Sequence, residues 1–407
     1  MQKTSSTAPS ALLIALIVAS LSMLAPFTID TYLPSFPAIA GELAASHAQI
    51  QQTMGLYLAV FACTTLVYGP LSDSFGRRPV IIIALALYAL ASAGAALTQS
   101  IEGLLFWRVM QGLSAGAGVV IGRAMVRDAF SGASAQRVLS YAMLIFAVAP
   151  AIAPMIGGLL QTLSGWRATF WFLALLGAAL FALVLWRAPE TLPPSERQSA
   201  QPGEVLHAYL MALRNRRFMG LVLAFSLNFS GFFLYIAGAP SIFYDQLHLG
   251  PNDFWMQFVP MVGGLMLGSY SSGRLAGRLA PERGIYISYI AMLSAAALNV
   301  AQALIFTPAP FNVLAPMVLY AFAVSFSMPS LTLLALDCLP HHRGMAAAVQ
   351  SFIQVGGNAL VAALLVPLLS AHIWSMALGM LILASAGFGV WVWLQRGGHQ
   401  HLENGAQ

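Results

Sequence analysis

Charged residues are scarce in this chain. Only 8% of its 407 residues are Asp, Glu, Lys or Arg, whereas 59% are hydrophobic and the mean hydropathy is +0.79. Soluble domains carry about a quarter charged residues. A water-soluble fold with so few charges would aggregate, so the composition excludes a soluble protein and indicates an integral membrane protein.

Cysteine is nearly absent as well. Cys63 and Cys338 are the two in the chain, and their spacing fits neither a metal site nor a redox site. The sequence also lacks a phosphate-binding loop, a cluster of metal ligands and a nucleophile–base constellation. We therefore expect no metal, no cofactor and no enzyme activity.

Long apolar runs fill most of the chain. A run of about 20 residues crosses roughly 30 Å of hydrocarbon as a helix, and only helices or closed barrels satisfy their backbone there. The first run is too long for a signal peptide and continues into Asp30 without a cleavage site. We predict an all-α membrane protein with twelve transmembrane helices near 11–36, 50–72, 79–98, 101–123, 137–162, 167–187, 218–243, 253–275, 285–306, 311–335, 345–369 and 373–394.

Positive charge is distributed unevenly between the loops. With the N-terminus placed in the cytoplasm, all but two of the 18 Lys and Arg residues lie on the cytoplasmic side; Arg167 is in an external loop and Arg108 is within a run. The positive-inside rule then predicts that both termini are cytoplasmic. The net charge of +5 is explained by orientation, so no nucleic-acid partner is expected.

A polar, proline-rich stretch at 188–217 divides the runs into six and six. We predict an N-terminal six-helix bundle (1–190), a cytoplasmic linker (191–217) with a short amphipathic helix around Val205–Leu213, and a C-terminal six-helix bundle (218–407). A faint repeat supports the division: Asp73-x-x-Gly76-Arg77 corresponds to Arg274-x-x-Gly277-Arg278. Two such halves place a substrate site at their interface near the midplane.

Two charged residues lie within the runs. Asp30 is the only acid well inside a run of the first half, and Arg108 is the only base inside any run. A carboxylate in hydrocarbon must be paired or protonated, so Asp30 is a candidate proton carrier. Both lie about seven residues, roughly 10 Å, from the same membrane face, which permits an ion pair if their helices are neighbours. Alternatively, Asp30 caps a broken helix before Pro34, and Arg108 packs permanently or extends to the surface.

A charged turn joins the second and third runs. It contains Gly69, Asp73, Gly76, Arg77 and Arg78. The two glycines permit a sharp reversal and close helix approach. The acid is placed to face the positive N-terminus of a helix in the other half, and the two arginines add charged contacts. Topology alone would explain the arginines but not the acid.

The chain resembles a major facilitator superfamily transporter of the drug:proton antiporter type, and within it the bicyclomycin/chloramphenicol resistance (Bcr/CflA) family. The resemblance covers essentially all runs and rests on the 69–78 turn and on Asp30-x-Tyr32-Leu33-Pro34, Arg108-x-x-Gln111-Gly112 and Ala153-Pro154-x-x-Gly157-Gly158. It implies a multidrug or antibiotic exporter of the bacterial inner membrane that works by alternating access and is driven by the proton gradient. Asp30 and Arg108 would couple protons, and the turn would latch the cytoplasmic side, with Arg127 as a plausible partner.

The fifth run carries the antiporter motif of this family, with Pro150, Ala153, Pro154, Gly157 and Gly158. The family has glycine at the position of Ala153, and alanine is a mild departure because it is also small. An ordinary kinked packing helix is the alternative. Some related exporters have a second acid at the position of Ser22; its absence favours one proton per cycle and a neutral or zwitterionic substrate.

Polar residues of the second half are candidate substrate contacts. Gln350, Gln354 and Asn358 form one stripe along the eleventh run, which suits a cavity wall or, alternatively, hydrogen bonds between helices. Tyr32, Asn228 and Tyr235 complete the candidate set. We expect a drug-like small molecule, protons and lipid as partners, and a monomer. A metabolite carrier for a nucleoside or amino acid, or a membrane sensor without transport, are the alternative functions.

Overall fold

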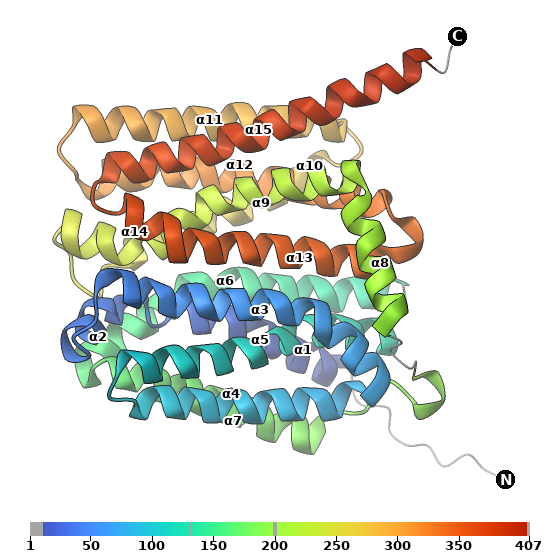
Figure 1. The fold of residues 1–407 in the computed structure, drawn as a ribbon, viewed down its shortest axis with the longest axis horizontal. Helices are drawn as coiled ribbons and strands as arrows, with labels where there is room; N and C mark the ends of the chain where they lie inside the picture. The colour runs from blue at the N-terminus through green and yellow to red at the C-terminus, as the bar shows by residue number, and fades with distance from the viewer. Residues whose placement is uncertain (1–10, 131, 198–201, 405–407) are drawn as a thin grey trace.

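The computed structural model describes residues 11–130, 132–197 and 202–404 as helices joined by short loops (Figure 1). The first half comprises α1 (Ala11–Asp30), η1 (Leu33–Ser35), α2 (Phe36–Glu42), α3 (His47–Phe75), α4 (Arg77–Leu97), α5 (Ile101–Ala129), α6 (Gly132–Ser164) and α7 (Trp166–Arg187). The second comprises α9 (Arg216–Ala237), η3 (Ser241–Gln246), α10 (Trp255–Leu275), α11 (Pro281–Ile305), α12 (Pro310–Asp337), α13 (Arg343–Leu360), η5 (Val361–Leu365), α14 (Val366–Leu369) and α15 (Ile373–Asn404). Between them lie η2 (Pro194–Glu196) and α8 (Pro202–Arg214), and η4 (Pro340–His342) precedes α13.

Ten helical segments of the described chain are long and apolar enough to cross a membrane. The helices α6 and α10 complete the expected twelve. No 18-residue stretch of α10 is as apolar as those of the ten, because glycine, serine and Gln257 interrupt it. In α6 the described apolar part is Val148–Ser164. The predicted all-α membrane fold is therefore confirmed.

The helices pack as two groups that meet along two seams. α1 and α3–α7 pack on one another, as do α9–α15, and Figure 1 shows the groups one above the other. The seams run between α3 and α13 and between α6 and α10. The short helix expected around Val205–Leu213 lies within α8.

The bundle has two distinct ends. The first residues of α1, the last of α15 and all of α8 lie at one end, which we call the α8 end; α2 and α14 lie at the other, the α2 end (Figure 1). The turn between α3 and α4 lies at the α8 end. There Gly76 has a φ of 97°, which glycine adopts without strain, and a Cβ on it would stand 2.5 Å from Glu190 Oε2.

The two halves are joined by hydrogen bonds at the α2 end. Tyr244 Oη donates to Pro34 O at 2.6 Å, and Gln51 Nε2 donates to Ala237 O at 3.2 Å. Two further side-chain pairs cross between the halves at 3.2 Å: Asn252 Nδ2 with Thr162 Oγ1, and His47 Nε2 with Ser370 Oγ. The structure is thus closed at its α2 end.

Removing the Tyr244 hydroxyl should favour opening of the α2 end. A hydrogen bond contributes about 1 kcal/mol, which corresponds to roughly a fivefold change in population. We expect Tyr244→Phe to raise the fraction of long distances between spin labels at Ala48→Cys and Ala371→Cys, two exposed positions on opposite halves, in a Cys63→Ala/Cys338→Ala background.

Tyr68→Phe is the matched control. Tyr68 Oη also donates to a backbone carbonyl at 2.6 Å, that of Leu113, but this bond stays within the first half. Its loss should leave the distance distribution unchanged. Identical distributions for wild type and Tyr244→Phe would show that the hydroxyl does not hold the halves together.

Candidate functional site

Arg108, on α5, lies in the interior of the first half and is fully shielded from solvent. Its guanidinium carbon lies 4.3 Å from the ring centre of Tyr32 and 4.4 Å from that of Tyr57. Its Nε donates to Thr53 O at 3.2 Å, and its Nη1 donates to Thr28 O at 3.3 Å. Aromatic faces and carbonyl dipoles from α1 and α3 therefore stabilise the buried cation in place of a counterion.

Gln111 extends this contact set to α4. It accepts from Arg108 Nη1 at 2.8 Å and donates through Nε2 to Ser92 Oγ at 2.8 Å. The hydroxyls of Thr28 and Tyr88 lie 2.6 Å apart and link α1 to the same helix. Arg108 Nη2 has no hydrogen-bond partner among the described residues. The N–H groups of this buried nitrogen are therefore free to donate.

Asp30 is the last residue of α1, where the chain breaks into η1 and α2. Its side chain is 4% exposed and forms no ion pair with any described residue. A helix C-terminus carries the negative end of the helix dipole, and burial removes the water that would solvate a carboxylate. A site of this kind can be neutralised by a proton, which suits a group that exchanges one.

The expected ion pair between Asp30 and Arg108 is not formed in this structure. Their helices α1 and α5 are neighbours, as the prediction required. The guanidinium is instead held by backbone carbonyls of α1 and α3 and by two tyrosine rings. Tyr32 connects the two sites, because it follows Asp30 closely in the chain and its ring contacts Arg108.

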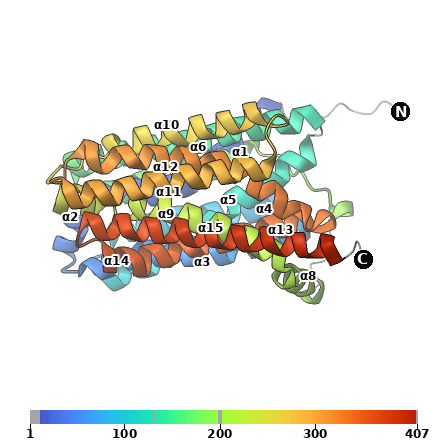
Figure 2. The same ribbon diagram turned by 90° about the horizontal axis from the view of Figure 1, so that it is seen from above.

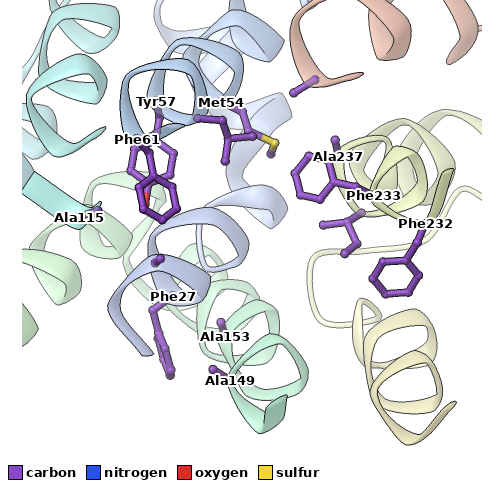
Figure 3. Packing of buried hydrophobic residues seen from close by; sticks show 14 of the residues in the cluster. Phe27, Met54, Tyr57, Phe61, Ala115, Ala149, Ala153, Phe232, Phe233 and Ala237 are labelled. Atoms are coloured by element: carbon purple, nitrogen blue, oxygen red, sulfur yellow. The ribbon is translucent and has the colours of Figure 1, made fainter. Parts of the chain in front are cut away.

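The motif of α6 lies between the segment that follows Asp30 and the second half. Ala149 and Ala153 lie beside Phe27 of α1 (Figure 3), and Ala153 is fully buried. A Cβ on Gly157 would stand 1.8 Å from Thr31 O, and a Cβ on Gly158 would stand 2.1 Å from Pro251 O. The first glycine lets α6 approach the residue after Asp30. The second lets the same helix contact the loop before α10.

The charged turn has its partners in the first half and at the start of the linker. Asp73 pairs with Arg77 at 2.5 Å rather than with a helix terminus of the second half, and Arg77 Nε pairs with Asp128 at 2.9 Å. Glu190 accepts from the backbone N–H groups of Arg77 and Arg78 at 3.0 and 3.3 Å. The carboxylate of Glu190 thus caps the positive N-terminus of α4.

Arg127 does not pair with Asp73 in this structure. It extends toward the second half, where its Nη1 lies 3.9 Å from the position that a Cβ on Gly344 of α13 would take. Because the halves are joined at the α2 end here, a latch at the α8 end would belong to a different conformation. Its residues Gly69, Asp73, Gly76, Arg77, Arg78 and Arg127 therefore remain a prediction.

Three candidate substrate contacts lie in the interiors of their own halves. Tyr32 is fully buried and its hydroxyl lies 3.2 Å from that of Thr53. Asn228 Nδ2 donates to Tyr289 Oη at 3.0 Å, and Tyr235 Oη accepts from Asn299 Nδ2 at 2.6 Å. Both partners are on α11, which packs on α12 and α15.

In this structure Tyr32, Asn228 and Tyr235 have hydrogen-bond partners within their own halves, and Asn228 Oδ1 is buried without a partner among the described residues, so their role as substrate contacts stays a prediction. A polar side chain in an apolar bundle gains most from a partner within that bundle. For Asn228 and Tyr235 the polar groups of α11 are such partners. The three residues therefore stabilise helix packing in this structure.

The polar stripe on α13 divides between two roles. Gln350 Nε2 donates to Thr332 Oγ1 of α12 at 3.0 Å, so this residue follows the helix-to-helix alternative. Gln354 is half-buried, and Asn358 is buried with its Oδ1 unpartnered among the described residues. Gln354 and Asn358 remain candidate substrate contacts.

Several residues that contribute to the site were not predicted from the sequence. Tyr57 resembles any aromatic residue at helical spacing, and Tyr244 and Glu190 lie in segments interpreted as loop or linker. Gln51 is different, because an amide near the start of an apolar run is a detectable signal. Among described residues no group of three or more His, Cys, Asp or Glu could hold a metal ion.

Two helical groups that meet along two seams, with a buried acid and a buried base in one of them, are the architecture expected of a multi-span membrane transporter. A model of the Major Facilitator Superfamily matches residues 18–362, and the chain belongs to this superfamily. The superfamily consists of transporters, which agrees with the expectation that the chain is not an enzyme.

Curated relatives align over most of the chain. An uncharacterized MFS-type transporter, YdgK of Bacillus subtilis, is 33% identical over 84% of this chain and 86% of its own length. A bicyclomycin resistance protein homolog of Haemophilus influenzae is 32% identical over 66% of this chain and 67% of its own. Multidrug resistance protein MdtL of Escherichia coli is 29% identical over 90% and 91%. These relatives support the resemblance to the bicyclomycin resistance family.

Solved transporters share the fold at low identity. A D-xylose-proton symporter matches with a TM-score of 0.71 at 16% identity, covering 93% of this chain and 97% of its own. The nucleoside transporter NupG (D323A mutant) matches with a TM-score of 0.69 at 16% identity, covering 95% and 99%. At this identity the likeness concerns the fold alone.

Adding a methyl group at Gly158 should separate the halves. Its Cβ would overlap Pro251 O, so we expect Gly158→Ala to lower the thermal unfolding temperature in detergent and to raise the population open at the α2 end. Gly263→Ala is the control, because nothing lies within 4 Å of a Cβ on this α10 glycine. Alanine there should be neutral or slightly stabilising. Equal unfolding temperatures for Gly158→Ala and wild type would contradict the close contact.

Arg108→Lys should destabilise the first half although the charge is retained. An ammonium cannot stack on tyrosine rings while also donating as a planar group to Thr28, Thr53 and Gln111. We expect a loss on the order of 2 kcal/mol, the size of a desolvated cation–π contact, measured as a lower unfolding temperature. Arg187→Lys, at an exposed arginine of α7, should unfold as wild type does. The contact set would be refuted if both variants were equally stable.

Proposed function

We propose that this protein is a proton-coupled exporter of drug-like molecules, working by alternating access in the bacterial inner membrane. The observation that carries the proposal is the position of Asp30 at the joint between the halves. The segment that follows it contacts α6 through Gly157 and is held to the second half by the hydrogen bond from Tyr244 to Pro34. A change of charge at Asp30 would therefore act where the α2 end opens and closes.

The proposed cycle uses this joint as follows. In the state open at the α2 end, Asp30 takes a proton from outside and substrate leaves. The protonated protein closes that end, releases the proton to the cytoplasm and binds the next substrate. One charge moving through about 100 mV supplies roughly 2.3 kcal/mol, and a pH gradient adds to it. No cofactor takes part, and Arg108 supplies a fixed positive charge near Tyr32.

The orientation is part of the proposal. Arginines gather at the α8 end, among them Arg77, Arg78, Arg127, Arg187 and Arg214, and the positive-inside rule places this end and both termini in the cytoplasm. The boundaries of two bundles (1–190 and 218–407) and of a linker (191–217) belong to the same proposal. Function as a monomer is also part of the proposal.

The drug-like substrate is inferred from the relatives named for multidrug and bicyclomycin resistance. A neutral or zwitterionic molecule fits best, because Asp30 is the one acid buried within a membrane-spanning helix of the described chain. A small metabolite such as a nucleoside is the second candidate. Gln354 and Asn358 favour it, since uncharged amides can bind a hydroxyl-rich solute.

A drug-susceptibility panel tests the function directly. Wild type, Asp30→Asn, Asp245→Asn and empty vector would be compared in a pump-deficient bacterium on phenicols, bicyclomycin and tetracycline, at expression matched by immunoblot. We expect protection by wild type and by Asp245→Asn, and none by Asp30→Asn. Asp245 is the control because it is an exposed acid at the same end of the bundle.

Two outcomes would separate the parts of the proposal. Full protection by Asp30→Asn would exclude Asp30 as the essential proton carrier and leave drug export intact. Absence of protection by the wild type would refute drug export and favour the metabolite alternative. Substrate-driven proton flux in proteoliposomes, with nucleosides and amino acids as substrates, would then test that alternative.

A further inference from the structure

The linker helix α8 lies across the bundle rather than along it. Figure 1 shows α8 running across the direction of the long helices, and Figure 2 places it at the periphery, beside the α3–α13 side of the molecule. Tyr209 Oη donates to Leu66 O of α3 at 2.7 Å. The helix also packs against α9 and α13. It therefore contacts both halves at one of their two seams.

The side chains of α8 form three faces in a fixed order. Residues of a helix are about 100° apart in projection. Ala212, which is fully buried, and Tyr209 lie on the face toward the protein. Leu206, Leu210 and Leu213 form the next face and are 58%, 41% and 48% exposed.

The third face of α8 is exposed, and its polar residues lie beside Met211, which is 36% exposed. This face carries His207 and Arg214, and the exposed Arg216 and Arg217 follow directly at the start of α9. No described residue forms an ion pair with these three arginines. Around α8, a face that packs on the protein is followed by the leucine face and then by the positively charged face. This arrangement is typical of a helix that lies in a membrane surface with its apolar side toward the acyl chains.

The surroundings of α8 identify what covers the leucines. Leu66, whose carbonyl binds Tyr209, is followed by Val67, which is 55% exposed, and Phe75 near the same end of α3 is 63% exposed. The helix that carries the leucines is thus bonded to a membrane-spanning helix whose neighbouring residues are apolar and exposed. With α3 spanning a bilayer, the leucines would face its acyl chains and the three arginines its headgroups.

We propose that α8 is an interfacial anchor that inserts Leu206, Leu210 and Leu213 into the bilayer and binds anionic phospholipid headgroups through Arg214, Arg216 and Arg217. Because α8 contacts α3 of one half and α13 of the other, bound lipid would hold the linker across the seam. The proposal depends on membrane insertion and not on the substrate or on proton coupling.

Quenching of a fluorescent label by lipid tests the insertion. The full chain, with Cys63→Ala and Cys338→Ala, would carry an NBD label at Leu210→Cys or at His207→Cys, in nanodiscs containing acyl-chain spin-labelled phosphatidylcholine with or without phosphatidylglycerol. We expect several-fold stronger quenching at 210 than at 207. Unquenched labels at both positions would show that the leucine face meets water or another protein, and would overturn the anchor.

The arginines are tested in the same system. Phosphatidylglycerol should increase quenching at 210, and Arg214→Gln/Arg216→Gln/Arg217→Gln should remove that increase. Arg278→Gln/Arg283→Gln, at two other arginines of the α8 end, is the matched control and should keep it. Quenching at 210 that is independent of phosphatidylglycerol in every variant would overturn the headgroup site. Gel filtration and thermal unfolding establish that each variant is folded before the comparison.

Discussion

The buried positive charge of Arg108 is the constraint on which the first half depends. A cation without a counterion is costly in hydrocarbon, and it is tolerated only where dipoles and aromatic faces surround it. Thr28, Thr53, Gln111 and two tyrosine rings meet this requirement, and they come from α1, the break that follows it, α3 and α5. Because these partners surround the guanidinium of Arg108, they position α1, α3 and α5 relative to one another.

The same arrangement leaves Asp30 without a permanent partner. Since Arg108 is held elsewhere, the carboxyl at the break of α1 can be neutralised by a proton instead of by a fixed cation. The break also supplies the surface against which the halves close. Gly157 lets α6 contact Thr31 beside the break, and Gly158 lets it contact Pro251 of the second half. Tyr244 of the second half donates a hydrogen bond to Pro34 O. In the proposed cycle, proton exchange and opening of the α2 end therefore involve the same short segment.

Much of the fold and part of the site followed from sequence because they depend on local properties. Apolar runs of sufficient length must become helices in a bilayer, whatever their neighbours, so the twelve helices could be predicted. Asp30 and Arg108 were identifiable because a charge in such a run is conspicuous. The amphipathic pattern of 205–213 likewise predicted α8, although not its position across the bundle.

The sequence by itself determined which segments span the membrane and which charges they bury, since hydropathy and helix length act residue by residue. Only the tertiary structure decided how side chains are directed. Tyr235 and Asn228 bond to α11 and Gln350 to α12, and Arg108 binds carbonyls and aromatic rings rather than Asp30. The rotation of a helix about its own axis depends on all of its neighbours, because each buried polar group must find a partner among them. That choice is made by packing across the bundle and cannot be read from one helix alone.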